Sequence, residues 1–159
     1  MAWDESYNDK FDLKYETYGV MLYRLSMVYI GNNDDAEEIM QEAFLKLLYN
    51  APDFVDDEHE KRWLIRITIN LCKDRLKSHW FKKTCPYNDI DLFAQDETDI
   101  EMAQLILSLP PKYKDVIHLY YFENYSIKEI GQILHIGTSA VKMRLKRAKE
   151  FLRIELEEY

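Results

Sequence analysis

The apolar residues between Phe11 and Tyr29 recur at alternating steps of four and three. Side chains at this spacing fall on one face of an α-helix, because a helical turn takes about 3.6 residues. The face consists of Phe11, Tyr15, Tyr18, Leu22, Leu25 and Tyr29. It predicts a long amphipathic helix that has to bury this face against other helices.

Residues that break helices are scarce in the rest of the chain. Only four Gly and four Pro occur among 159 residues, while 47% of the residues are apolar. Such a composition is typical of a folded protein rather than a disordered one, and it favours helices over strands joined by turns. We therefore expect an all-α fold, in one domain or in two small ones.

Acidic and basic residues are concentrated in different segments of the chain. The formal net charge of −8 by itself argues against a nucleic-acid partner. However, residues 1–60 hold 4 basic and 15 acidic side chains, residues 61–83 hold 8 basic and 1 acidic, and residues 126–153 hold 7 basic and 2 acidic. Two cationic segments in an acidic frame predict two anion-binding faces and an acidic surface for a basic partner.

A second helix is expected to start at Asp34 and to stop before Pro52. Gly31 and the two asparagines after it would end the first helix. Asp34 then has the position of an N-cap, and Glu37 is three residues later, where it can complete a capping box. The positions that would face the core are Ala36, Met40, Ala43, Phe44, Leu47 and Leu48.

A third helix of about twenty residues is predicted from Glu58 to Ser78. Its core stripe would be Ile65, Ile69, Cys72 and Leu76, widened by Leu64, Thr68 and Leu71. Within an arc of about 60° on another side lie four cations, Arg62, Arg66, Lys73 and Lys77. Trp63 and Asn70 project beside them. Such cations can bind phosphates and the Trp ring can stack on a base, which suits a face that binds single-stranded or distorted DNA. The alternative is a solvated face with a Trp at the edge of the core.

Helical periodicity is lost from about His79 to Ile100, where Cys85-Pro86 and several acidic residues indicate a flexible linker. We therefore expect a small helical domain in residues 1–78, the linker in residues 79–100 and a second small helical domain in residues 101–159. In the second domain, Pro111 would stand in the first turn of a helix. The buried positions that follow it would be Val116, Leu119, Tyr120 and Phe122.

The C-terminal domain carries a helix-turn-helix pattern. Ser126 and Glu129 have the spacing of a capping box, and Gly131 allows two crossing helices to approach closely. After a short turn, a second helix would turn its apolar residues inward and keep five cations outside: Lys142, Arg144, Lys146, Arg147 and Lys149. In this motif the second helix enters the major groove of DNA.

The cations of this second helix have different expected roles. Lys142 and Arg147 are candidates for base edges, since a Lys or Arg can contact guanine at O6 and N7. Phosphate contacts are assigned to Lys128, Arg144, Lys146 and Lys149. The alternative is an ordinary helical hairpin with a solvated basic face, which the concentration of five cations on one helix makes the weaker interpretation.

No catalytic, metal or cofactor site is predicted. Cys72 and Cys85 lack the spacing of a zinc site and the density of a secreted disulfide scaffold, so we expect reduced thiols. No Gly-rich phosphate loop or nucleophile pattern is present, which disfavours a helical enzyme. The first residues do not resemble a signal peptide, and no apolar run approaches about 18 residues. A cytoplasmic protein without membrane insertion is expected.

Three ordered segments resemble the sigma-70 family of RNA polymerase subunits, and their order and spacing resemble its extracytoplasmic-function (ECF) group, which keeps only two domains. Residues 34–47 (DDAEEIMQEAFLKL) are similar to the helix that binds the polymerase clamp. Residues 63–70 (WLIRITIN), with Asp74-Arg75, are similar to the helix that melts and reads the minus-ten element. Leu107 to Pro111, Tyr121-Phe122 and Val141 to Ala148 are similar to the domain that reads the minus-thirty-five element.

The resemblance implies three sets of site residues. Polymerase contacts would come from Asp34, Glu37, Glu38, Gln41, Glu42 and Phe44. Minus-ten DNA would be held by Arg62, Trp63, Arg66, Asn70, Lys73 and Lys77, with the loop from Pro52 to Glu60 framing a pocket for a flipped base. Minus-thirty-five DNA would be read by Lys128, Thr138, Ser139, Lys142, Met143, Arg144, Lys146 and Arg147.

The same resemblance implies a transcription initiation factor that is a monomer when free. Its partners would be core RNA polymerase, promoter DNA and an anti-sigma factor. Many relatives begin the recognition helix with Gly-Thr where this chain has Ser139-Ala140, so promoter preference does not transfer. The rival hypothesis is a stand-alone helix-turn-helix regulator that binds palindromic operators as a dimer without polymerase.

Overall fold

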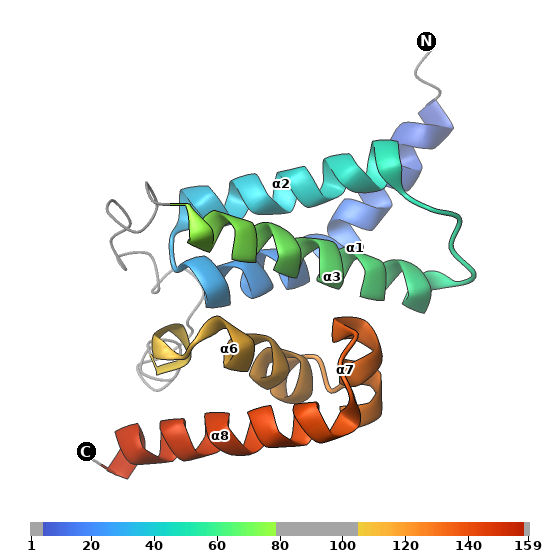
Figure 1. The fold of residues 1–159 in the computed structure, drawn as a ribbon. Helices are drawn as coiled ribbons and strands as arrows, with labels where there is room; N and C mark the ends of the chain where they lie inside the picture. The colour runs from blue at the N-terminus through green and yellow to red at the C-terminus, as the bar shows by residue number, and fades with distance from the viewer. Residues whose placement is uncertain (1–4, 79–104, 158–159) are drawn as a thin grey trace.

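The computed structural model describes residues 5–78 and 105–157, and the described residues contain helices but no strands (Figure 1). This confirms the expected all-α fold. The predicted linker, residues 79–100, and Cys85 lie outside the described residues. The N-terminal half holds α1 (Glu5–Ile30), α2 (Asn33–Asn50) and α3 (Asp57–Lys77), and the C-terminal half holds α6 (Pro111–Ile117), the π-helix η2 (His118–Phe122), α7 (Ile127–Leu134) and α8 (Thr138–Glu157).

The three long N-terminal helices pack as a bundle around the apolar face predicted for α1. Tyr18 and Leu22 of α1 share a buried cluster with Phe44 of α2 and Leu64 of α3. Tyr15, at the edge of the face, is partly exposed, and its ring lies 4.9 Å from the ring of Phe44. The alternating spacing therefore predicted the buried face correctly and overestimated its width by one residue.

The start of α2 differs from the expectation. Asn32, not Asp34, is the N-cap, and its side-chain oxygen accepts a hydrogen bond of 3.0 Å from the backbone N–H of Asp35. The chain leaves α1 at Gly31, whose φ of 69° is the left-handed conformation that glycine adopts easily, so the next helix begins sooner. Asp34 is instead exposed in the first turn, where its charge suits the positive helix end.

The C-terminal half contains one segment that the sequence did not indicate. Pro111 stands in the first turn of α6 as expected, but the helix then continues as the π-helix η2. The backbone N–H of Glu123 donates to the carbonyl of His118, five residues earlier. The wider turn changes which residues face inward: Leu119 is buried, while Phe122, predicted to be buried, is 55% exposed.

The two halves of the chain lie against each other in this structure (Figure 1). Helix α3 packs against α7, and α1 packs against α6. One continuous cluster of buried side chains includes Tyr29 and Ile30 from the end of α1, Ile65 and Ile69 from α3, and, from the C-terminal half, Val116, Ile117, Leu119, Ile130 and Val141. The two halves therefore share one hydrophobic core and do not merely touch at their surfaces. Across the described ranges, no helix is both long and apolar enough to cross a bilayer.

Candidate functional site

The helix-turn-helix forms as its residues predict. The Ser126 hydroxyl accepts a hydrogen bond of 3.1 Å from the backbone N–H of Glu129, and the Glu129 carboxylate accepts one of 3.0 Å from the backbone N–H of Ser126. A Cβ atom added to Gly131 would lie 2.8 Å from the carbonyl oxygen of Ile136, so glycine permits the close approach between α7 and the turn. His135 ends α7 in the left-handed conformation, with φ of 55°.

Helix α8 turns Val141, Leu145 and Ala148 into the core and leaves its cationic side outside. Arg144 is half-buried, so it is less available to phosphate than expected. The other residues predicted to read the minus-thirty-five element are exposed: Lys128 on α7, and Thr138, Ser139, Lys142, Met143, Lys146 and Arg147 on α8. This surface has the exposure and the charge that a major-groove helix needs.

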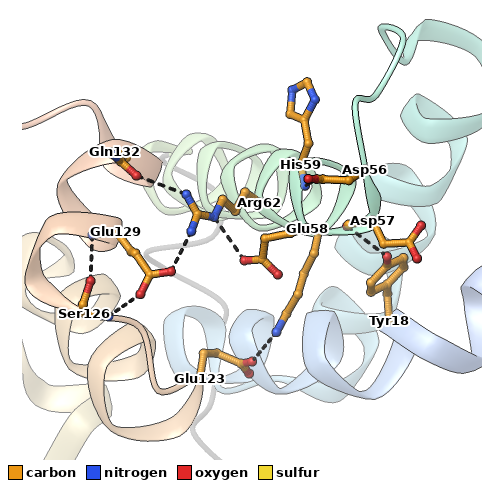
Figure 2. Close-up of polar contacts among 11 residues, drawn as sticks. Tyr18, Asp56, Asp57, Glu58, His59, Arg62, Glu123, Ser126, Glu129 and Gln132 are labelled. Carbon is orange, nitrogen blue, oxygen red and sulfur yellow. Dashed lines mark hydrogen bonds and ion pairs between the residues drawn. The ribbon is translucent and has the colours of Figure 1, made fainter.

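Two cations predicted to bind DNA on α3 have partners in the C-terminal half. Arg62 Nη2 lies 2.7 Å from a carboxylate oxygen of Glu129, and Arg62 Nη1 donates a hydrogen bond of 3.2 Å to Gln132 (Figure 2). Lys73 Nζ lies 3.2 Å from a carboxylate oxygen of Asp115. In this arrangement both cations are already paired with carboxylates of the C-terminal half.

The other four residues of α3 that were predicted to bind minus-ten DNA have no such partners among the residues that the structure describes. Asn70 and Lys77 are exposed and Arg66 is half-buried. Trp63 is half-buried beside the loop before α3, with its ring edge-on to Phe54 at 5.6 Å. These four side chains are reachable from solvent without separating the two halves of the chain.

A cavity of about 510 Å³ opens beside that loop. It is lined by Lys14 and by residues 51–57, and Glu60 closes one side through an ion pair of 2.6 Å with Lys14. The Tyr18 hydroxyl donates to the Asp57 carbonyl at 3.4 Å, which ties the loop to α1. Burial and then the charge of Glu60 raise the pKa of Tyr18 to about 12, so its hydroxyl remains a donor. The cavity is where the loop was predicted to frame a pocket, and its rim is strongly acidic.

The exposed face of α2 carries most of the predicted polymerase contacts. Asp34, Glu37, Glu38, Gln41 and Glu42 are all exposed. The prediction that Phe44 contacts the polymerase is wrong. Its side chain is 2% exposed and its ring packs against Phe11 and Tyr15, so it cannot touch a partner. Leu45 and Tyr49, which are 52% and 68% exposed, continue the same face, and neither was among the predicted contacts.

Lys114 is buried where the two halves meet. Its ammonium donates a hydrogen bond of 3.3 Å to the backbone carbonyl of Tyr29, in the last turn of α1, where carbonyls lack helical partners. Burial lowers the pKa of Lys114 to about 8, because no carboxylate offsets the lost hydration. The Lys114 ammonium thus donates to a carbonyl that the helix itself leaves unpaired, and it loses hydration by being buried there.

This burial predicts a pH-dependent stability. Since the pKa of Lys114 is lowered on folding, the unfolded chain holds more protons between about pH 8 and 10.5, and stability rises with pH in that window. Between pH 7 and 8.5 we expect a gain of roughly 1 kcal/mol from this group. Lys114→Met should remove that part of the slope, which denaturant unfolding of both proteins at the two pH values will measure. Equal slopes would show that Lys114 is hydrated.

Comparison with known proteins identifies two family regions in the chain. The family model for sigma-70 region 2 matches residues 15–82, and the model for sigma-70 region 4 matches residues 99–152. The chain is 33% identical to the ECF RNA polymerase sigma factor SigW of Bacillus subtilis, over 90% of this chain and 87% of that protein. It is 30% identical to the RNA polymerase sigma factor SigV of the same organism, over 84% and 83% of the two chains.

Solved structures with low sequence identity share the fold. CnrH, solved in complex with the cytosolic domain of CnrY, matches with a TM-score of 0.72 at 20% identity, over 95% of this chain and 90% of that chain. RpoE of Bartonella quintana, solved with the anti-sigma factor NepR, matches with a TM-score of 0.71 at 14% identity, over 93% and 97%. With both family regions present in order and with relatives of this similarity, the chain belongs to the ECF group of the sigma-70 family, whose members are transcription initiation factors that direct RNA polymerase to promoters.

Proposed function

We propose that this sigma factor divides its work among three helices. Helix α2 binds core RNA polymerase, α3 and the adjacent cavity melt and read the minus-ten element, and α8 reads the minus-thirty-five element. In this proposal residues 1–78 and 101–159 act as the two domains and residues 79–100 as the linker, and the protein changes no covalent bond itself. The observation that carries the proposal is the exposed cationic face of α8, held outward by a short, firmly capped α7.

The recognition helix gives the first test. Lys142→Ala or Arg147→Ala should lower transcription from a promoter that depends on its minus-thirty-five element about 5- to 100-fold, because a bidentate contact to guanine contributes about 1–3 kcal/mol. The measurement is run-off transcription with reconstituted polymerase. Lys112→Ala is the control, since it removes an exposed cation from α6 of the same domain. Unchanged transcription in both α8 variants would reject this assignment.

The minus-ten proposal rests on α3 and on the cavity beside it. Trp63 supplies a ring at the cavity loop, and Asn70 and Lys77 supply exposed polar groups farther along the helix. The carboxylates of Asp53, Asp56 and Asp57 at the cavity accept hydrogen bonds. A flipped base with an exocyclic amine therefore suits this pocket better than thymine does.

The polymerase-binding face gives a second test. Gln41→Ala with Glu42→Ala should weaken binding to core polymerase about tenfold, since both side chains are exposed at the centre of the proposed face. Thermal unfolding should change little, because neither side chain is buried. Binding is measured by titrating polymerase against labelled protein. The control is Glu16→Ala, an exposed carboxylate on α1. A native-like binding constant would count against α2.

Location and further partners follow from the proposed role. A protein that binds RNA polymerase works in the cytoplasm, where the polymerase is. One structural relative was solved with the cytosolic domain of CnrY, and another with the anti-sigma factor NepR. We therefore propose an anti-sigma factor as a partner of this chain, and a monomer in its absence.

The rival, a stand-alone regulator that binds operators as a dimer, is not favoured. It would leave the region 2 match over residues 15–82 and the exposed face of α2 without a role. The deciding experiment mixes the purified chain with core polymerase and genomic template and maps the 5′ ends of the transcripts. Initiation at discrete sites supports the sigma factor, whereas tight binding to a palindrome without polymerase supports the rival.

A further inference from the structure

Met143 is an apolar residue in the middle of the cationic face of α8. Among the side chains of this helix that the structure describes, residues 138–153, it is the only large apolar one that is exposed, and its exposed fraction is 54%. A single exposed apolar residue is ordinary on a protein surface. The position of Met143 on the helix, more than its exposure, therefore points to a function.

The side chain of Met143 projects away from the core of the C-terminal half. The buried residues on the inner side of the helix are Val141, Leu145 and Ala148. At about 100° per residue, Met143 projects within roughly 15° of the direction opposite to the centre of this buried stripe. Ser139 lies one turn before Met143 and Arg147 one turn after it, and both are exposed. Met143 is thus at the centre of the outward face.

Cations flank Met143 on both sides of this face. Lys142 and Lys146 project on one side of it and Arg147 on the other, and all three are exposed. In the major groove, phosphates lie along the two walls and the base edges form the floor. When the cations reach for the walls and for guanine, the residue between them faces the floor. Met143 is therefore the side chain that α8 would bring closest to the bases.

The chemistry of a thioether limits which base Met143 can favour. Its side chain has no hydrogen to donate, and its sulfur is only a weak acceptor. The polar edges of guanine, cytosine and adenine would lose hydration against it without gaining a good hydrogen bond. The C5-methyl group of thymine is the apolar group that the major groove offers, and the flexible, polarisable side chain of Met can pack against it.

We propose that Met143 selects a thymine in the minus-thirty-five element by packing against its C5-methyl group. The contact rests on the proposed function, because it requires α8 to lie in the major groove. It adds a third point of discrimination to the guanine contacts proposed for Lys142 and Arg147, and this one depends on apolar contact instead of charge.

Deoxyuridine tests the contact, because it lacks the C5-methyl group and keeps the hydrogen-bonding edge of thymidine. Templates are made from a promoter mapped by its transcript 5′ ends, with each thymidine of the minus-thirty-five element replaced in turn. Run-off transcription with reconstituted polymerase, below saturation, compares wild type with Met143→Ala and with Met143→Leu, which keeps a large apolar side chain. The control is Val20→Ala, which shortens an exposed apolar side chain on α1.

We expect one position at which deoxyuridine lowers wild-type transcription about fourfold, the factor that corresponds to one methyl group removed from water. Met143→Ala should be at least about fourfold weaker than wild type on the thymidine template and should lose nothing further with deoxyuridine. Met143→Leu and Val20→Ala should respond to deoxyuridine as wild type does.

Several results would overturn the contact. These are a minus-thirty-five element that holds only G·C pairs, a wild type that ignores deoxyuridine at every position, and an equal response of wild type and Met143→Ala, which would assign the effect to DNA shape. If wild type ignored deoxyuridine and Met143→Ala were still weak, Met143 would contact the polymerase instead. A wild type that starts transcripts at no discrete site, on any template, would reject the proposed function itself.

Discussion

Phe44→Ala should lower the free energy of unfolding by about 3–5 kcal/mol, as expected for the loss of a large buried aromatic side chain. The ring is almost fully buried between α1 and α2, in edge and tilted contact with Phe11 and Tyr15. Removing it leaves a cavity that the three packed helices can fill only in part. Urea unfolding followed by far-ultraviolet circular dichroism measures the loss.

Two controls separate a structural role for Phe44 from a contact with polymerase. Glu42→Ala, on the exposed face of the same helix, should change the free energy of unfolding by no more than about 0.5 kcal/mol. Phe44→Leu keeps most of the buried volume and should bind core polymerase as wild type does. A stable Phe44→Leu protein that failed to bind polymerase would restore the original prediction of a surface contact.

Gly131→Ala should destabilise the C-terminal half by about 1–3 kcal/mol, because the new methyl group would lie 2.8 Å from the backbone carbonyl of Ile136. A backbone atom cannot rotate away as a side chain can, so α7 and the turn must move apart. That movement would also shift α8, and transcription from a promoter with a minus-thirty-five element should fall. Chemical denaturation and run-off transcription measure the two effects.

Gly19→Ala provides a control of the opposite sign. Gly19 is inside α1, and a Cβ atom there would have only ordinary contacts at 3.8 Å with the Tyr15 ring. Alanine is favoured over glycine inside a helix, so this variant should be more stable by about 0.5–1 kcal/mol. If Gly131→Ala behaved like Gly19→Ala, the close approach at the turn would be wrong.

Local patterns in the sequence predicted the local structure well. The spacing of apolar residues identified the buried face of α1, and α3 begins and ends within one residue of the expected positions. The capping box of Ser126 and Glu129 and the close approach at Gly131 formed as predicted, because each depends on residues a few positions apart. The N-cap of α2 was misplaced because Asn32 and Asp34 are both good caps, and the conformation of Gly31 decided between them.

Features that depend on distant residues could not be predicted in this way. Arg62 and Glu129 are separated by 67 positions, and no periodicity links them. The helical projection of α3 correctly gathered the cations on one side but could not show that carboxylates from the other half would meet two of them. The π-helix exposed Phe122 for a similar reason, since a change of helical register leaves no pattern in residue types.

Arg75 lies near the end of α3 and holds two carboxylates of α2 at once, Asp35 at 2.8 Å and Glu38 at 3.0 Å. Glu38 belongs to the face proposed for polymerase, and α3 to the face proposed for DNA. A polymerase cation that drew Glu38 away would leave Arg75 with Asp35 alone and loosen the tie between the two helices. Binding to the polymerase would thereby change how firmly α2 holds α3, the helix proposed to bind promoter DNA, through a single guanidinium.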